Sequence, residues 1–116
     1  ASDVYKRQKL ILPEATENSN PSWFGFLITV KEGVDRRELV EYIEGHNIQT
    51  RALFAGNILK HPCFDEIRGT NAYRVISDLE NSNRILNDTF WIGVYPGMTK
   101  EKLDYMIKVI KKYFNR

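Results

Sequence analysis

The sequence is poor in the residues that build disulfide frameworks and metal centres. It contains one cysteine and two histidines among 116 residues. A single thiol cannot form an internal disulfide, and alone it cannot make a thiolate metal site, so we expect a reducing compartment and a cytoplasmic protein. The seven glycines are scattered along the chain, and no glycine-rich phosphate-binding motif is present.

An excess of one charge and a long apolar run are also lacking. The 17 Lys and Arg residues face 15 Asp and Glu residues, for a net charge of +2. This balance is not typical of a nucleic-acid-binding surface, and no apolar run reaches the roughly 20 residues that span a membrane. We therefore expect no nucleic acid and no membrane as partners. With 42% hydrophobic residues and the length of one typical domain, the chain can bury a core.

The first eight residues, ASDVYKRQ, differ from the rest of the chain. They match the translation of a common transposase sequencing adapter in one reading frame. We interpret 1–8 as an adapter artefact, so that natural sequence begins at Lys9 and an upstream part is missing. The alternative is a genuine polar N-terminal arm.

Aromatic and β-branched residues predict three strands, at 23–30, 48–54 and 89–95. Both faces of the segment 23–30 are largely apolar, which predicts a central strand covered on both sides. The polar segment 13–22 contains two prolines and is typical of a loop or linker. We also expect an extended stretch at 71–76.

Helix signals alternate with these strands. Asp35 and Glu38 resemble a capping box, and the helix that they begin should stop at 45–47. Thr99 should cap a final amphipathic helix, and a short helix at 81–86 and a helical turn at 62–67 are expected between them. The pattern predicts an α/β chain that folds as a two-layer sandwich, with the helices on one side of a small sheet.

The sequence His61-Pro62-Cys63 places an imidazole close to a thiol. No third ligand follows nearby, so we interpret it as an ordinary loop histidine beside a small buried cysteine rather than a metal site or a nucleophile. His46 follows a predicted helix and is expected to cap it. Arg51 and Arg84 border predicted loops, where a guanidinium suits a phosphate or carboxylate; surface ion pairs are the alternative.

From Lys9 onward, the sequence resembles the C-terminal small domain of the DegT/DnrJ/StrS family of vitamin-B6-dependent sugar enzymes. Five blocks carry this resemblance in order: LPEA at 12–15, PSWFGF at 21–26, TRALFAGN at 50–57, NRILN at 83–87 and TFWIGVYPG at 89–97. The Phe-Ala-Gly-Asn stretch resembles the branch of CDP-4-dehydro-6-deoxyglucose 3-dehydrases. The resemblance implies the small domain of the aspartate-aminotransferase-like fold of PLP-dependent transferases.

The resemblance also implies a reaction. Pyridoxamine 5'-phosphate, the amine form of pyridoxal 5'-phosphate, condenses with the C4 ketone of a CDP-hexose, and the C3 hydroxyl leaves, in the synthesis of deoxysugars for the lipopolysaccharide O-antigen. The histidine that acts as base in this branch, and any iron–sulfur cluster, would belong to a large upstream domain. The complete enzyme would be a homodimer with a reductase partner, and this chain alone would be inactive.

The resemblance also implies four residues at the cleft that holds the cofactor and the substrate. They are Phe24, Arg51, Asn57 and Arg84. Their alternative role is packing at a domain interface. Trp23 and residues 10–12 would be exposed in this chain, because the chain lacks much of the homodimer interface. No catalytic residue and no metal ligand are expected here.

The resemblance divides the chain into a junction at 9–22 and a small domain at 23–116. Two other functions remain open. One is a nucleotide-sugar aminotransferase of the same family, which would use an upstream lysine. The other is a stand-alone ligand-binding or interaction module with a ferredoxin-like sandwich.

Overall fold

A four-stranded antiparallel sheet forms the centre of the computed structural model, which describes residues 8–116. The strand order is β1-β2-β4-β3, and the bounds are Leu10–Ile11 for β1, Gly25–Val30 for β2, Thr50–Ala52 for β3 and Thr89–Gly93 for β4. The three predicted strands are present, each shorter than its apolar segment. Residues 1–7 lie outside the described part, so the adapter interpretation stays a prediction.

The strand β2 is central, as predicted, because it pairs with both β1 and β4. Its two faces differ in burial. Ile28 and Val30 are buried, whereas Leu27 and Thr29 on the other face are only partly buried. The expectation that both faces are covered is therefore wrong for the described residues.

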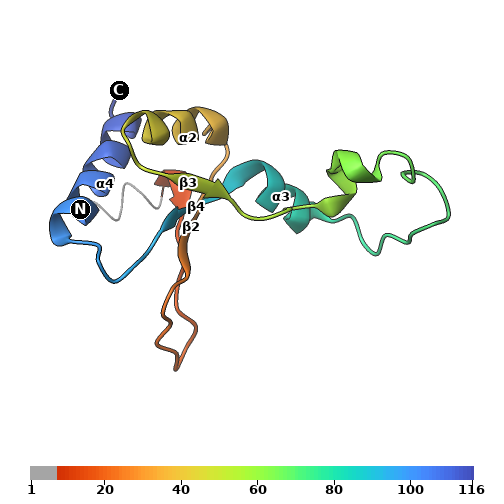
Figure 1. Ribbon diagram of the computed structural model, residues 1–116, viewed down its shortest axis with the longest axis horizontal. Helices are drawn as coiled ribbons and strands as arrows, with labels where there is room; N and C mark the ends of the chain where they lie inside the picture. The colour runs from red at the N-terminus through yellow and green to blue at the C-terminus, as the bar shows by residue number, and fades with distance from the viewer. Residues whose placement is uncertain (1–7) are drawn as a thin grey trace.

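The helices α2 (Arg36–Gly45) and α4 (Lys100–Phe114) lie against the same side of the sheet (Figure 1). This arrangement is the predicted two-layer α/β sandwich. The core between the layers consists of buried residues from the sheet, from both helices and from Ile48: Leu10, Ile28, Val30, Leu39, Ile43, Ile48, Phe90, Ile92, Val109, Ile110 and Tyr113. Leu10 belongs to this core, so the expected exposure of residues 10–12 is wrong at that position.

Two predicted helix caps are confirmed. Asp35 accepts a hydrogen bond from the backbone N–H of Glu38, at 3.1 Å. Thr99 accepts one from the N–H of Lys102, at 3.2 Å, and this satisfies an N–H group that has no partner inside the helix. The middle helix α3 runs over Glu80–Asp88 and begins after Leu79, which makes no side-chain cap.

The C-terminus is tied to α2 by a charged and aromatic contact. The Arg116 guanidinium lies over the Tyr113 ring, 4.3 Å from its centroid, and bonds the Glu38 carboxylate at 2.6 Å. Burial raises the pKa of the Tyr113 hydroxyl, and the nearby Glu38 carboxylate raises it further.

Among residues 8–116, the helices are too short or too polar to span a membrane.

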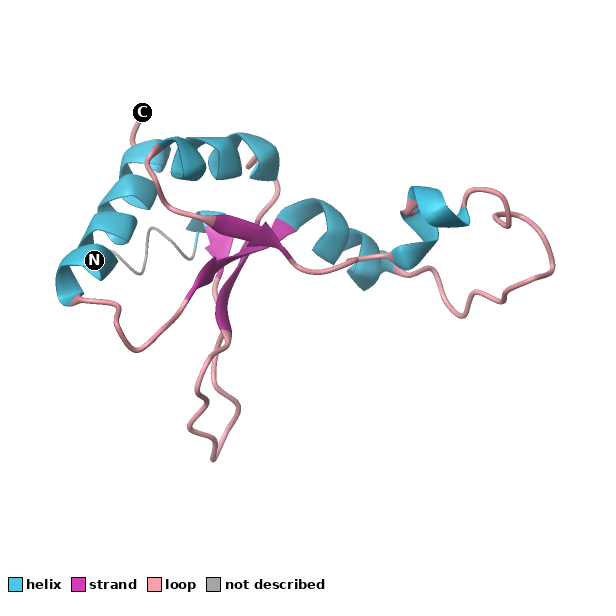
Figure 2. Ribbon diagram, in the orientation of Figure 1, coloured by secondary structure: helices cyan, strands magenta, loops and turns pink. Residues whose placement is uncertain are grey.

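The molecule is more extended than a compact domain of its length. Its radius of gyration is 16.8 Å, against about 13 Å for a compact chain of this size. Residues 53–79, which we call the arm, leave the sheet after β3 and extend beyond α3 (Figure 1). The loop between β1 and β2 also projects away from the strands (Figure 2). The arm contains two short 3-10 turns, Ile58–Lys60 and Pro62–Phe64, and the extended stretch expected at 71–76 is irregular instead.

Candidate functional site

A shallow groove lies on the face of the sheet that the helices leave open. It is lined by Phe24, Arg51, Ala52, Phe54 and Trp91, and we call it the Phe24–Arg51 groove. Strand alternation explains the lining: Arg51 on β3 is the Cα partner of Trp91 on β4, so both side chains point to the same face. The Phe24 ring lies beside the Trp91 ring in this groove, and the two ring centroids are 5.5 Å apart.

The groove combines one cation with exposed aromatic rings. Phe24 and Phe54 are each 79% exposed, and Arg51 is exposed as well. The Trp91 indole is held in place, because its Nε1–H donates to the carbonyl oxygen of Ala52 at 3.1 Å. Ring faces beside a guanidinium suit a planar or sugar-like ligand with an anionic group.

The close approach of the Trp91 ring to β2 requires a glycine at position 25. A Cβ atom at position 25 would lie 2.2 Å from a ring carbon of Trp91. The residue paired with Gly25 across the sheet is Gly93, where an added Cβ would meet no atom within 4 Å. The two glycines thus occupy one pair of the β2–β4 ladder, and only one of them is fixed by packing.

We expect Gly25→Ala to displace the Trp91 indole and to lower the free energy of unfolding by about 1–3 kcal/mol, as overpacking does. Urea unfolding followed by tryptophan fluorescence measures both effects. Gly93→Ala is the matched control and should leave the emission spectrum unchanged. Equal effects of the two substitutions would contradict the packing role of Gly25.

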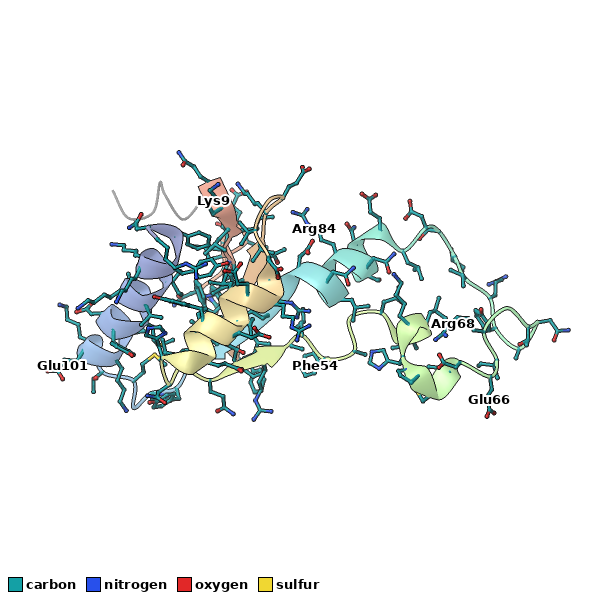
Figure 3. All side chains as sticks on the ribbon, turned by 90° about the horizontal axis from the view of Figure 1, so that it is seen from above. Lys9, Phe54, Glu66, Arg68, Arg84 and Glu101 are labelled. Carbon is teal, nitrogen blue, oxygen red and sulfur yellow. The ribbon has the colours of Figure 1, made fainter. Side chains whose placement is uncertain are left out.

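The structure brings two of the four expected site residues together. Phe24 and Arg51 line the same groove. Asn57 and Arg84 do not line it and are associated instead with α3. Figure 3 shows Phe54 at the end of β3 and Arg84 on α3, which extends away from the sheet.

Asn57 is 6% exposed and both polar groups of its side chain have partners within the chain. Its Oδ1 accepts from the N–H of Leu59 at 3.1 Å, and its Nδ2 donates to Oδ1 of Asn83 at 2.8 Å. The residue thus fastens the start of the arm to α3. Arg84, the next residue after Asn83, is exposed on that helix.

Sequence reasoning missed Trp91 and Phe54 as groove residues. Both lie in the blocks that carry the family resemblance, but strand pairing alone reveals that Trp91 stands opposite Arg51. The signal that could have found Trp91 is the alternation of 89–93, which places it on the face away from the buried Phe90.

The two histidines are structural, as expected. The backbone N–H of His46 caps α2, and its Nδ1 lies 2.7 Å from the carbonyl oxygen of Tyr42. The Nε2 of His61 lies 2.6 Å from the carbonyl oxygen of Ala55 in the arm. Cys63, however, is exposed, so its expected burial is wrong. Among residues 8–116, no group of three His, Cys, Asp or Glu residues is placed to hold a metal ion.

Comparison with known proteins extends this description. Residues 4–111 match the model of the DegT/DnrJ/EryC1/StrS aminotransferase family. The chain is 52% identical over 107 residues to the lipopolysaccharide biosynthesis protein RfbH of Salmonella typhimurium, covering 90% of this chain and 24% of that protein. It is 46% identical over 106 residues to a dTDP-4-dehydro-2,6-dideoxy-D-glucose 3-dehydratase of Saccharopolyspora spinosa, covering 90% of this chain and 22% of that protein.

Solved structures show the same fold. The GDP-4-keto-6-deoxy-D-mannose-3-dehydratase of E. coli, determined with hydrated PLP, superposes with a TM-score of 0.74 at 27% identity, over 93% of this chain and 27% of that one. The chain therefore spans about a quarter of the length of the relatives that it matches. It belongs to the DegT/DnrJ/EryC1/StrS aminotransferase family and has the α/β small-domain fold of the PLP-dependent aminotransferase-like proteins.

Proposed function

We propose that this chain is the small domain, with its junction at 9–22, of a pyridoxamine-phosphate-dependent 3-dehydratase acting on CDP-4-dehydro-6-deoxyglucose. The observation that carries the proposal is the ranking of its relatives. Identity is 46% to one sugar 3-dehydratase and 28% to another, but 22% to a dTDP-4-amino-4,6-dideoxy-D-glucose transaminase. The 52% identity to the lipopolysaccharide biosynthesis protein RfbH supports a role for the reaction in lipopolysaccharide biosynthesis.

The groove residues fit part of a site for the cofactor and the sugar. Arg51 offers a guanidinium to an anionic group, and the rings of Phe24 and Trp91 can cover the face of a planar or sugar ring and exclude water. The groove lining contains no lysine or histidine, so we assign the base to the polypeptide outside this chain. Pyridoxamine phosphate, when bound, supplies the amine that reacts with the ketone and the conjugated system that accepts electrons.

The remaining parts of the proposal concern the complete enzyme. We assign the binding of the cofactor mainly to the large domain, and any iron–sulfur cluster to cysteines outside this chain, since Cys63 alone cannot hold one. We also propose a cytoplasmic homodimer with a reductase partner. Asn57 and Arg84 then act where the arm and α3 meet the cleft.

Arg51→Ala in the complete enzyme tests the assignment of the groove. We expect kcat/KM for the CDP-sugar to fall at least tenfold, because a charge-assisted hydrogen bond to the substrate or cofactor is lost. Arg84→Ala tests in the same way whether α3 contributes to the site. Loss of the C3 hydroxyl is followed by mass spectrometry of the product.

Arg37→Ala is the matched control, because the Arg37 side chain is 85% exposed on α2, where it pairs with Glu41. It should retain the activity of the unchanged enzyme. An Arg51→Ala enzyme with unchanged kcat/KM would remove the groove from the proposal. Formation of an amino sugar rather than a dehydrated sugar would replace the dehydratase by the aminotransferase.

A further inference from the structure

The arm is an unusually long connection for a small domain. Between the end of β3 at Ala52 and the start of α3 at Glu80, it contains only two 3-10 turns. Loops beyond about 12–15 residues that lack helices and strands are uncommon, and they usually carry a function or are disordered. The contacts inside the arm favour a function over disorder.

Side-chain hydrogen bonds to the backbone fix the shape of the arm. Arg68 donates through Nε to the carbonyl oxygen of Leu59 at 2.7 Å and through Nη2 to that of His61 at 3.1 Å, and it also pairs with Asp65. The Tyr73 hydroxyl accepts from the N–H of Gly69 at 2.8 Å. These bonds surround a small apolar pocket, lined by Ile58, Leu59, Phe64, Ile67, Arg68 and Tyr73. The arm is thus ordered by its own residues.

Large apolar side chains nevertheless remain on the surface of this ordered segment. Phe54 is 79% exposed, Ile76 is 70% exposed and Ile58 is 57% exposed. Ile67 and Val75 are exposed as well. Apolar residues that are ordered but uncovered mark a surface that is already shaped for a partner, because little conformational entropy is then lost on docking.

Backbone strain lies at both ends of the arm. Phe54 has φ of 47° at its start, and Ser77 and Leu79 have φ of 70° and 56° at its end. A left-handed backbone is unfavourable for phenylalanine and leucine, and such conformations persist where surrounding structure imposes them. These conformations therefore indicate that the surrounding structure fixes the backbone at both ends of the arm.

We propose that the apolar residues of the arm dock onto the part of the same polypeptide that this chain does not contain. The relatives supply the argument, since the chain spans only 24% and 22% of their lengths, and about three quarters of each relative lies outside the match. The charges on the arm are mixed, which favours an apolar protein surface over a polyanion: Lys60, Asp65, Glu66, Arg68, Arg74 and Asp78. This inference rests on the proposed assignment of the chain to a larger enzyme.

Hydroxyl-radical footprinting of the complete protein tests the docking. We expect Ile58 and Ile76 to be oxidised at least fivefold more slowly there than in the 116-residue chain, in which both are exposed. In the complete protein, Ile76→Asp should raise oxidation of Ile58 at least fivefold, whereas the conservative Ile76→Val should leave it low. Light scattering gives the mass of each sample.

Three outcomes overturn the proposal. Fast oxidation of Ile58 and Ile76 in the unchanged complete protein shows that nothing covers the arm. Unchanged oxidation of Ile58 in Ile76→Asp shows that its cover does not depend on this surface. If Ile76→Asp increases the oxidation of Ile58 and also halves the mass of the protein, the surface binds a second copy of the same protein. Because dehydratase activity is not the readout, an inactive protein with a protected arm contradicts the proposed function alone, and an active one with an exposed arm contradicts this inference alone.

Discussion

Phe90→Ala should lower the free energy of unfolding of this chain by about 3–5 kcal/mol. Phe90 is 1% exposed and lies in β4, opposite Ile28 of β2 and Ala52 of β3. Truncation removes the apolar area of the ring and leaves a cavity beneath both helices, which the paired strands cannot collapse to fill. Because small domains have only about 5–15 kcal/mol in total, this loss is a large share of the stability.

Urea unfolding followed by circular dichroism measures this loss. Phe24→Ala is the matched control, because it deletes the same ring atoms from a side chain that is 79% exposed. The control should cost less than about 1 kcal/mol, mainly through its contact with Trp91. Comparable losses in the two variants would show that Phe90 does not fill the core.

Gly56→Ala has the second largest expected effect, about 2–4 kcal/mol, for two reasons. Gly56 has φ of 62°, a left-handed conformation that alanine adopts only with strain. An added Cβ would also lie 2.7 Å from the Cα atom of Leu86 in α3, so the clash is with backbone that cannot rotate away. The arm and α3 would separate, and the hydrogen bond between Asn57 and Asn83 would break.

Gly69→Ala separates the two contributions. Gly69 lies in the same arm with φ of 84°, and an added Cβ there meets no atom within 4 Å. It should therefore cost only the conformational strain, about 1 kcal/mol. Differential scanning calorimetry of the two variants measures the difference. Equal melting temperatures would contradict the close approach of the arm to α3.

Local signals were sufficient to predict most of the sheet and its helices. The caps at Asp35 and Thr99 are formed by side chains within three residues of the N–H groups that they bond, so the sequence contains the whole interaction. Aromatic and β-branched residues likewise predict β2 and β4. The ends of the strands depend on pairing, however, and the predicted strand 48–54 is limited to Thr50–Ala52, where β4 provides a partner.

The arm could not be predicted from local patterns. The segment 71–76 has the composition of a strand, but no neighbouring strand pairs with it, and the chain there is irregular. The shape of the arm depends on Arg68, which bonds carbonyl groups seven and nine residues earlier in the chain. Such bonds follow from the path of the backbone and leave no periodic signal in the sequence.

The candidate site was predicted in part for the same reason. Arg51 and Phe24 were identified from the family blocks, and the strand register brings them into one groove through Trp91. Asn57 and Arg84 were identified in the same way, but in this chain Asn57 joins the arm to α3 and Arg84 is exposed on that helix. Whether they also reach the cleft depends on polypeptide outside the chain, and their role stays a proposal.

The strand order has a consequence for synthesis on the ribosome. β4 pairs with both β2 and β3, and the hydroxyl groups of Thr29 and Thr89, which join β2 to β4, are 60 residues apart in sequence. Until residue 93 emerges from the exit tunnel, the apolar strand β2 can pair only with the two-residue β1, and such a short hairpin is at best marginally stable. The nascent chain therefore exposes β2 while the arm and α3 are translated, and a chaperone that binds extended apolar segments would find its target there.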